Sequence, residues 1–461
     1  MWPPSIHGLE QQSKLLQAKE LSTIQPRCQL LKFPILTWQH VAHLLVSNFI
    51  DLTDPDEEEM IMLIDDDDQE MADILAAQHN SMLTLNEFQP SNLEEVLRIH
   101  KALTFAVRRK HIMTDAFRRL QQIPDPHIFK TKSIKIIFVG EPAVDEGGPT
   151  REFFTEVFRS IRKSSLMTDR DNLSHNVLHL SKQHYKLVGQ LIALSIMNSG
   201  PNPLLFCRPT AEHILNSGQL SEDLSIEDVS DAQLREHLLK IANMENEEEF
   251  VNYVEQHLER RHDIGYSKVL SLQDKSDLSL HLIKDDVICR CSAELQQLDE
   301  GLTCLDVLPM MRRHPSMFLP VMMKTTEPLA ATDMGRLFTP VHSVEGSNKR
   351  EAEEEIMVNW YMLLEALNDG AVNNMKGDET ITMSMTDLLM FVTGMESLPI
   401  EGFSPSNPEI HFDHVTTQRK ITANTCGLIL SIPVNANTIS AEPFQQEMLE
   451  AVVNGQGFGQ P

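Results

Sequence analysis

The sequence predicts an α+β fold, in which a mostly helical first part is joined by a flexible hinge to a smaller α/β second part, after an acidic head. Three observations support this fold class. Compact β-branched runs lead into amphipathic helices, a turn-rich stretch at 340–350 separates two groups of such elements, and one block of the head is dominated by carboxylates. The 461 residues, 41% of them hydrophobic, suffice for about three domain-sized units.

The head, residues 1–90, is expected to be disordered. Between Asp51 and Glu70 it carries a dense run of carboxylates and neither lysine nor arginine. Like charges at this density repel one another and favour an unfolded chain.

A basic helical stretch is expected next, at 91–121, and opens the first part. Its sequence, SNLEEVLRIHKALTFAVRRKHIMTDAFRRLQ, reads as helical. Arg108, Arg109 and Lys110 are interpreted as a solvated face of that helix rather than a nucleic-acid patch.

A buried strand follows at 133–139, because SIKIIFV is a compact β-branched run. The Gly-Gly-Pro segment at 147–149 predicts a tight turn, and a helix begins there with Phe153, Phe154 and Val157 on its core face. Carboxylates near this turn are expected to cap it and to pair with Arg151; they are Asp145, Glu146 and Glu152.

The remaining elements follow in order. A buried helix is expected within 184–201, where apolar residues share one face and Gly-Pro ends the run. The hinge at 340–350 is rich in turn residues and has no apolar periodicity. Beyond it we expect helices in 359–367 and 385–394, a strand around Ile410, a loop and strand around Cys426, and a last helix ending at Gly455.

Cys426 lies in the segment KITANTCGLILSIPV near the end of the chain. Leu428, Leu430 and Ile432 alternate as in a strand, and Pro433 stops it. Cys426 should therefore sit on an exposed loop just before a rigid element. A free cysteine is more often a small buried hydrophobe, so this pattern alone does not establish a nucleophile.

The loop resembles the active-site loop of HECT-type ubiquitin ligases, of the form LPxAxTCxxxLxLP. The agreeing positions are Ala423, Thr425, Cys426, Leu430, Ile432 and Pro433. Lys420 and Ile421 stand where the family has Leu-Pro. Further strings resemble the family in the same order: GEPAVDEGGPTREFF, HYKLVGQLIALSIMNSGP, SAELQQLDEGL and MFVTGMESLPIEGF. The sequences of several stretches resemble most the vertebrate branch of HECT ligases that is named for the G2/M phase.

This resemblance implies the bilobal HECT fold. Its N-lobe, mostly helical, would span residues 92–339 and its C-lobe, with the catalytic cysteine, residues 351–461. The hinge at 340–350 would join them, after the acidic head at 1–90.

The resemblance also implies two-step nucleophilic catalysis. Cys426 would accept ubiquitin as a glycyl thioester from a ubiquitin-conjugating enzyme and pass it to a lysine of a protein substrate. Thr425 would help to place the sulfur, and Phe458 resembles the family's phenylalanine near the C-terminus that assists transfer to lysine. The implied partners are ubiquitin, the conjugating enzyme and the substrates, and no cofactor is expected.

Composition argues against several other classes. The net charge of −28 opposes nucleic-acid binding, which needs a basic face. No apolar run approaches the roughly 20 residues that span a bilayer, and the first residues lack a signal-peptide core. We therefore expect no nucleic-acid or membrane partner and an intracellular location, in the nucleus or cytoplasm.

The six cysteines are scattered and form no disulfide ladder, which suits a reducing compartment. Cys289 and Cys291 are two residues apart, but no second cysteine-histidine pair follows at zinc-site spacing. We expect no metal site.

Two apolar runs in the head resemble SUMO-interacting motifs. Each has β-prone residues followed by carboxylates, which suits strand addition to a sheet edge with a basic rim. The residues expected to contact SUMO are Ile50, Leu52, Ile61, Leu63 and Ile64. The alternative interpretation is a helix for the first run and an ordinary acidic segment for the second.

Three functions remain open at this stage. The first is an active HECT ligase, acting in part on SUMO-modified substrates. The second is a catalytically weak HECT-fold adaptor that reads SUMO, because Lys420 and Ile421 alter the loop. The third is a thiol hydrolase that pairs Cys426 with His411 or His414, although no residue is evidently placed to orient either histidine.

Overall fold

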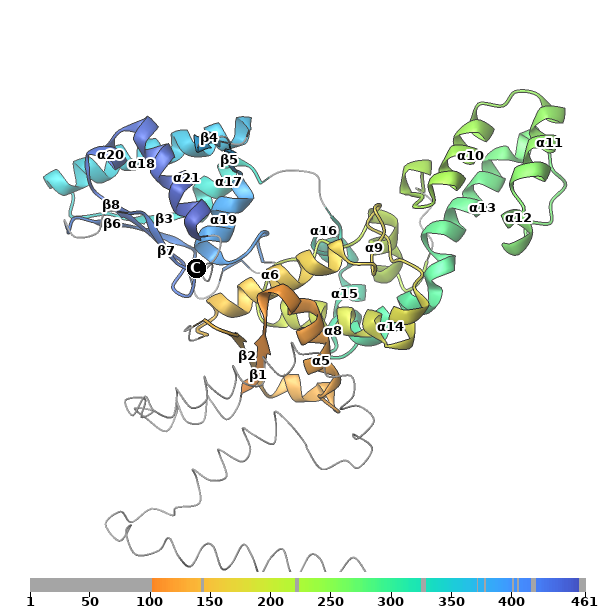
Figure 1. Ribbon diagram of the computed structural model, residues 1–461, viewed down its shortest axis with the longest axis horizontal. Helices are drawn as coiled ribbons and strands as arrows, with labels where there is room; N and C mark the ends of the chain where they lie inside the picture. The colour runs from red at the N-terminus through yellow and green to blue at the C-terminus, as the bar shows by residue number, and fades with distance from the viewer. Residues whose placement is uncertain are drawn as a thin grey trace, which may run out of the picture. The chain divides into compact units, whose positions relative to one another are not determined.

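The computed structural model describes residues 102–141, 145–219, 224–324, 329–370, 372–376, 379–399, 402–403, 406–415 and 420–455. Their buried apolar side chains form two hydrophobic cores. We call residues 102–324, around the first core, the first lobe, and residues 329–455, around the second core, the second lobe. The first lobe is mostly helical and the second combines a sheet with helices, so the predicted α+β fold class is confirmed (Figure 1).

The first lobe opens with two parallel strands, β1 (Ala102–Val107) and β2 (Ser133–Phe138). The prediction of a helix at 102–107 is wrong, because this segment forms β1. Leu103, Phe105 and Val107 alternate into the core, and pairing with β2 satisfies the backbone, so the β pattern prevails over the helical one. Helix begins only at α5 (Ile112–Gln121).

The basic residues after β1 are also not a simple solvated face. Arg108 Nη2 lies 2.9 Å from Asp115 Oδ1. Arg109 pairs with Glu141 and Glu152, and its guanidinium carbon lies 4.2 Å from the centre of the Phe138 ring. Of these predicted surface residues only Lys110 is exposed.

The helix α6 (Gly148–Lys163) begins where the Gly-Gly-Pro turn predicts. Gly147, its N-cap, has φ of 110°, a backbone conformation that glycine adopts without strain. The buried Asp145 carboxylate accepts hydrogen bonds from the Ile136 and Gly147 amides at 2.7 and 2.8 Å, and from the Thr150 hydroxyl. Asp145 therefore caps the turn as expected, and the core-facing side chains of α6 are buried.

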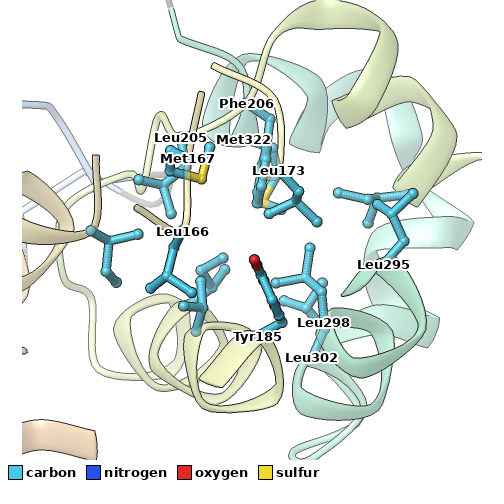
Figure 2. Close-up of a cluster of buried hydrophobic side chains, with 14 of the residues drawn as sticks. Leu166, Met167, Leu173, Tyr185, Leu205, Phe206, Leu295, Leu298, Leu302 and Met322 are labelled. Carbon is cyan, nitrogen blue, oxygen red and sulfur yellow. The ribbon is translucent and has the colours of Figure 1, made fainter. Parts of the chain in front are cut away.

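Two helices cross closely in the first core, α8 (His184–Met197) and α14 (Ser292–Leu302). Gly189 and Gly301 allow this approach. A Cβ on Gly189 would lie 2.3 Å from the Leu298 carbonyl oxygen, and one on Gly301 2.0 Å from that of Lys186. Tyr185, Leu298 and Leu302 point into the apolar cluster beside the crossing (Figure 2).

The other helices of the first lobe are α7 (Val177–Ser181), α9 (Arg208–Leu215), α10 (Ala232–Ala242), α11 (Glu247–His257), α12 (Arg260–Asp263), α13 (Lys275–Val287), α15 (Val307–Arg313) and α16 (Pro315–Met322). Short 3-10 turns lie at Arg109–His111, Pro126–Lys130, Ile226–Asp228, Leu272–Asp274 and Cys289–Cys291. Among the helices that the structure describes, none is both long and apolar enough to cross a bilayer.

The second lobe contains a four-stranded sheet in the order β3-β6-β8-β7. These strands are β3 (Thr339–Val341), β6 (Glu409–Asp413), β7 (Thr422–Asn424) and β8 (Ile429–Pro433). β6 runs parallel to β3 and β8, whereas β7 and β8 form an antiparallel hairpin. A separate hairpin joins β4 (Val372–Lys376) to β5 (Glu379–Met383).

The helices that the structure describes in the second lobe are α17 (Ala331–Leu337), α18 (Asn348–Asp369), α19 (Met385–Thr393), α20 (Ala436–Ile439) and α21 (Ala441–Gly455). Trp360, Leu389 and Phe444, from three of them, pack in one core with Ile410 and Leu430 of the sheet. The helices and strands predicted after the hinge are therefore present, although α18 begins earlier than expected.

The segment predicted as the hinge, 340–350, is partly strand and partly helix in the structure. Its first residues belong to β3, and α18 starts at Asn348 with Ser347 as its N-cap. Between them, the Ser343 amide and hydroxyl both donate to the buried Glu353 carboxylate. The first core reaches Met323 and the second begins at Leu329, so the chain passes between the cores before this segment. Motion between the lobes remains a prediction.

Candidate active site around Cys426

Cys426 lies in the four-residue turn between β7 and β8, directly before β8 as the strand alternation predicts. The Asn424 side chain accepts a hydrogen bond from the Gly427 amide at 3.0 Å, which braces the turn. Leu428 is buried and has φ of 57°, a left-handed conformation that is uncommon outside glycine and asparagine. The turn therefore holds Cys426 in a defined place, and the residue is half-buried rather than exposed.

The two residues that depart from the family string have different environments. Ile421 is buried in the second core, where it anchors the strand that leads to the turn. Lys420 is exposed. An apolar side chain is thus buried at the base of the hairpin, although the proline of the family string is absent.

The turn lies against the first residues of α6. A Cβ placed on Gly148 would lie 2.9 Å from Cys426 Sγ and 2.6 Å from Thr425 Oγ1. Both distances are shorter than real contacts of a Cβ, so this approach depends on glycine at position 148.

Arg151 of α6 holds the same turn through its guanidinium. Its Nε donates to the Thr393 carbonyl oxygen at 3.0 Å, and its Nη2 donates to the Thr425 carbonyl oxygen. Burial lowers the pKa of Arg151, and Cys426 and Asp145 oppose this shift through their charge. The prediction that Glu152 pairs with Arg151 is wrong. Glu152 pairs with Arg109 instead, and its Oε1 lies 2.7 Å from Arg109 Nη1.

Further along α6, three polar side chains also reach the second lobe. Thr155 Oγ1 donates to the Gly394 carbonyl oxygen at 2.8 Å. Arg159 Nε and Arg162 Nη2 donate to the two carboxylate oxygens of Glu396, at 3.0 and 2.9 Å. Burial alone would lower the pKa of Arg159, but hydrogen bonds and charge from Glu396 and Glu156 leave it raised.

A cavity of about 340 Å³ lies beside Arg151. Residues of the first lobe, including Lys135, Glu146 and Asn198, form most of its wall, and Phe403 of the second lobe completes it. Both lobes therefore bound this cavity, and Arg151 is the residue of its wall that also holds the Cys426 turn.

The other described cysteines have unfavourable surroundings for a nucleophile. Burial raises the pKa of Cys207 and Cys304 to about 11 and that of Cys291 to about 12. Burial also raises the pKa of Cys289, although this residue is exposed. Since the thiolate is the reactive form, these thiols are held in the unreactive state.

Neither histidine considered with Cys426 bonds to it among the described contacts. His411 Nε2 lies 2.7 Å from Glu409 Oε2, and His414 Nε2 lies 2.6 Å from Glu353 Oε1. His414 follows the carboxyl end of β6, whereas Cys426 precedes the amino end of the parallel strand β8. The structure thus does not assemble a cysteine-histidine pair from these residues.

Several predicted site residues lie outside the described residues. They are Phe458 near the C-terminus and the SUMO-contacting set Ile50, Leu52, Ile61, Leu63 and Ile64. Within the described part of the chain, no three histidine, cysteine or acidic side chains are grouped as metal ligands.

The polar face of α6 that meets the second lobe was missed by sequence reasoning. Arg151, Thr155, Arg159 and Arg162 recur three or four residues apart, on a side of the helix that adjoins the phenylalanine face. This periodicity was a usable signal for a second contact face, but the segment that it contacts could not be read from the sequence.

Comparison with known proteins covers the region in which this site lies. A model of the HECT domain (ubiquitin-transferase) matches residues 148–284 and 379–460, which include α6 and the Cys426 turn. The chain is 27% identical over 304 residues to the human G2/M phase-specific E3 ubiquitin-protein ligase, covering 65% of this chain and 40% of that protein. It is 28% identical over 268 residues to the protein of that name from Gallus gallus, covering 58% and 34%.

A further similarity is to the human probable E3 ubiquitin-protein ligase HERC3, at 30% identity over 178 residues, 36% of this chain and 16% of that protein. The matched region is thus well under half of each of these relatives. The expected resemblance to HECT-type ubiquitin ligases, and among them to the G2/M-phase branch, is confirmed.

Proposed function

We propose that this chain is a ubiquitin-protein transferase of the HECT type that carries ubiquitin on Cys426. The supporting observation is the position of Cys426, which lies half-buried on a braced turn inside the family-matched region. The thiols of Cys207, Cys291 and Cys304 are unsuited to this role because their pKa values are raised.

In the first step the Cys426 thiolate attacks the thioester that joins the terminal glycine of ubiquitin to a conjugating enzyme. A bond forms between Cys426 Sγ and the carbonyl carbon, the bond to the enzyme's sulfur breaks, and that sulfur leaves as a thiolate. In the second step the neutral amine of a substrate lysine attacks the new thioester. The amide bond forms, Cys426 leaves as a thiolate, and the amine loses a proton to solvent.

Thr425 and the backbone of the turn would position the sulfur, and Phe458 would assist the second step. Movement between the lobes would carry Cys426 from the conjugating enzyme to the lysine. We place this activity in the nucleus or cytoplasm, because a reactive thiol persists in a reducing compartment.

The direct test is thioester formation. The purified chain is incubated with ubiquitin, activating enzyme, ATP and each member of a panel of conjugating enzymes, and the products are separated with and without reductant. We expect a reductant-sensitive ubiquitin adduct. Cys426→Ala should abolish it, and Cys426→Ser should give an adduct that resists reductant.

Cys289→Ala is the matched control, since Cys289 is exposed and belongs to the same lobe as the buried thiols. It should load as the native chain does. An adduct that survives Cys426→Ala and is lost with Cys289→Ala would contradict the assignment, and no adduct with any conjugating enzyme would favour the adaptor function.

We also propose that the head recruits SUMO-modified substrates. This rests on the two apolar runs and their flanking carboxylates, spaced closely enough to engage adjacent units of a SUMO chain. A peptide of residues 45–70 should bind di-SUMO more tightly than mono-SUMO. A peptide with Ile50, Leu52, Leu63 and Ile64 changed to alanine is the control, and equal binding by it would reduce the attraction to charge alone.

A further inference from the structure

One face of α6 contacts the second lobe from its first turn to its last. We call Gly148, Arg151, Thr155, Arg159 and Arg162 the α6 strip. These residues recur three or four positions apart, so they form one continuous stripe on the helix. Each of them lies against the second lobe, and the contacts run from the Cys426 turn to Glu396.

Arg151 links the strip to the peptide that precedes the sulfur. Its planar guanidinium donates in two directions, to the carbonyl at the end of α19 and to the Thr425 carbonyl. Because the Thr425 carbonyl belongs to the peptide joined to Cys426, its hydrogen bond sets the orientation of that peptide relative to α6.

Gly148 supplies the space for the turn. Its φ does not lie in the left-handed region, so alanine can take its backbone conformation. An alanine there would nevertheless collide with Cys426 Sγ and Thr425 Oγ1. Gly148→Ala is therefore a variant that disturbs the contact while leaving α6 able to form.

Glu396 holds the other end of the strip. Arg159 and Arg162 both donate to its carboxylate, and its side chain is 23% exposed. This ion-pair cluster lies on the turn after α19, and none of its members belongs to the Cys426 turn. It can therefore be broken without altering the immediate surroundings of the sulfur.

We propose that the α6 strip positions Cys426 for the transfer of ubiquitin to lysine, with Arg151 as the positioning residue; this rests on the proposed role of Cys426 as the ubiquitin carrier. In the docked arrangement the sulfur is half-buried against α6. A lysine side chain is narrow enough to approach it, whereas a second folded protein bearing its own thioester needs a wider opening. Loading therefore occurs with the strip undocked, and discharge with it docked.

The test measures the two steps separately in single turnovers. Glu396→Arg places three arginines together and undocks the strip, and Gly148→Ala undocks it by collision. Both should load within about twofold of the native rate and discharge to lysine about tenfold more slowly, since a small misplacement of a reacting group has effects of this size or larger. Arg151→Gln should behave likewise, and Arg151→Lys, which can reach one carbonyl, should recover part of the rate.

Charge exchange provides the specific control. Arg159→Glu and Arg162→Glu combined with Glu396→Arg restore opposite charges across the contact and should return discharge toward the native rate. Gly335→Ala, whose Cβ would lie 3.4 Å from the Tyr361 ring, serves as a glycine control away from the strip and should leave both steps unchanged.

A second measurement reports docking without ubiquitin. The rate at which N-ethylmaleimide alkylates Cys426, followed by mass spectrometry, should rise several-fold in Glu396→Arg and fall back in the charge-exchanged variant. Faster alkylation with unchanged discharge would show that docking occurs but has no part in transfer, which overturns this proposal and leaves the carrier role of Cys426 intact. No change in either rate would overturn docking itself, and failure of the native chain to load would overturn the proposed function.

Discussion

Two buried carboxylates hold turns that the hydrophobic cores do not reach. Asp145 joins β2 to the start of α6 through backbone amides and a threonine hydroxyl. Glu353 accepts from the Ser343 amide at 2.7 Å and lies 2.6 Å from His414 Nε2, so it joins α18 to the segment after β3 and to the end of β6. Hydrogen bonds to a charged acceptor stabilise more than neutral ones, so each carboxylate fixes several segments at once.

Glu353→Gln should lower the free energy of unfolding of the second lobe by about 2 kcal/mol at neutral pH, because it removes a charged acceptor from a buried site. Burial alone would raise the pKa of Glu353, but hydrogen bonds from Ser343 and His414 leave it below its ordinary value of 4.5. The stabilisation is therefore complete above that ordinary value and is lost as pH falls through the lower, folded-state pKa. Denaturant unfolding of both proteins between pH 7 and about pH 3 checks this. A difference that grows on acidification would contradict it.

Deletion of residues 458–461 should separate the two steps of the proposed reaction. These residues include Phe458 and are too few to support a core, so Cys426 should still load ubiquitin while discharge onto lysine falls. Phe458→Leu, which keeps an apolar side chain, is the comparison. Equal loss of loading and discharge would indicate a packing role for this phenylalanine.

Helices α8 and α14 cross so closely that neither Gly189 nor Gly301 has room for a Cβ atom. Both collisions at Gly189 and Gly301 involve the backbone of the opposite helix, which cannot rotate away as a side chain can. The two helices therefore approach only where neither carries a side chain, and this single point aligns the apolar residues on both sides of it.

Gly189→Ala should destabilise the first lobe by about 3 kcal/mol, because its Cβ would lie 2.3 Å from a backbone oxygen. Gly335→Ala in α17 makes only an ordinary contact and should stabilise its helix by up to about 1 kcal/mol. Thermal and denaturant unfolding of the two variants should thus shift in opposite directions. A neutral Gly189→Ala would mean that α8 and α14 can separate without loss.

The sequence predicted these elements unevenly. The core face of α6, the strand that follows Cys426 and the last helix were predicted correctly, since each has a clear local period. The strand β1 was not, because its alternation lies within a stretch that also reads as helical, and only pairing with β2 decides between them. The partners of Arg151 could not be predicted, because they lie more than two hundred residues away in the chain.

At the scale of the whole molecule, the two cores have no buried apolar residue in common among those that the structure describes. Hydrogen bonds and ion pairs join the lobes at α6, beside the close approach of Gly148 to the Cys426 turn. Such contacts contribute less to cooperativity than a shared core, and they weaken at high salt when partly exposed.

Thermal unfolding should accordingly show two transitions. Trp360→Ala removes a fully buried side chain from the second core, at a cost of about 3 to 5 kcal/mol, and should lower the midpoint of one transition only. Phe154→Ala in the first core should lower the other. Hydrogen exchange assigns each transition to its lobe. A single transition that shifts with both substitutions would mean that the lobes unfold together.

The placement of the sulfur against α6 bears on the design of small electrophiles that react with Cys426. Such a compound would bond to the hairpin turn while meeting a wall formed by Gly148 and Arg151, with the adjoining polar cavity open to any group extended past the arginine. The thiol that reacts with the compound belongs to the second lobe, and the wall that would make its binding selective belongs to the first lobe. An inhibitor shaped to both would therefore bind a single arrangement of the lobes and trap the protein in it.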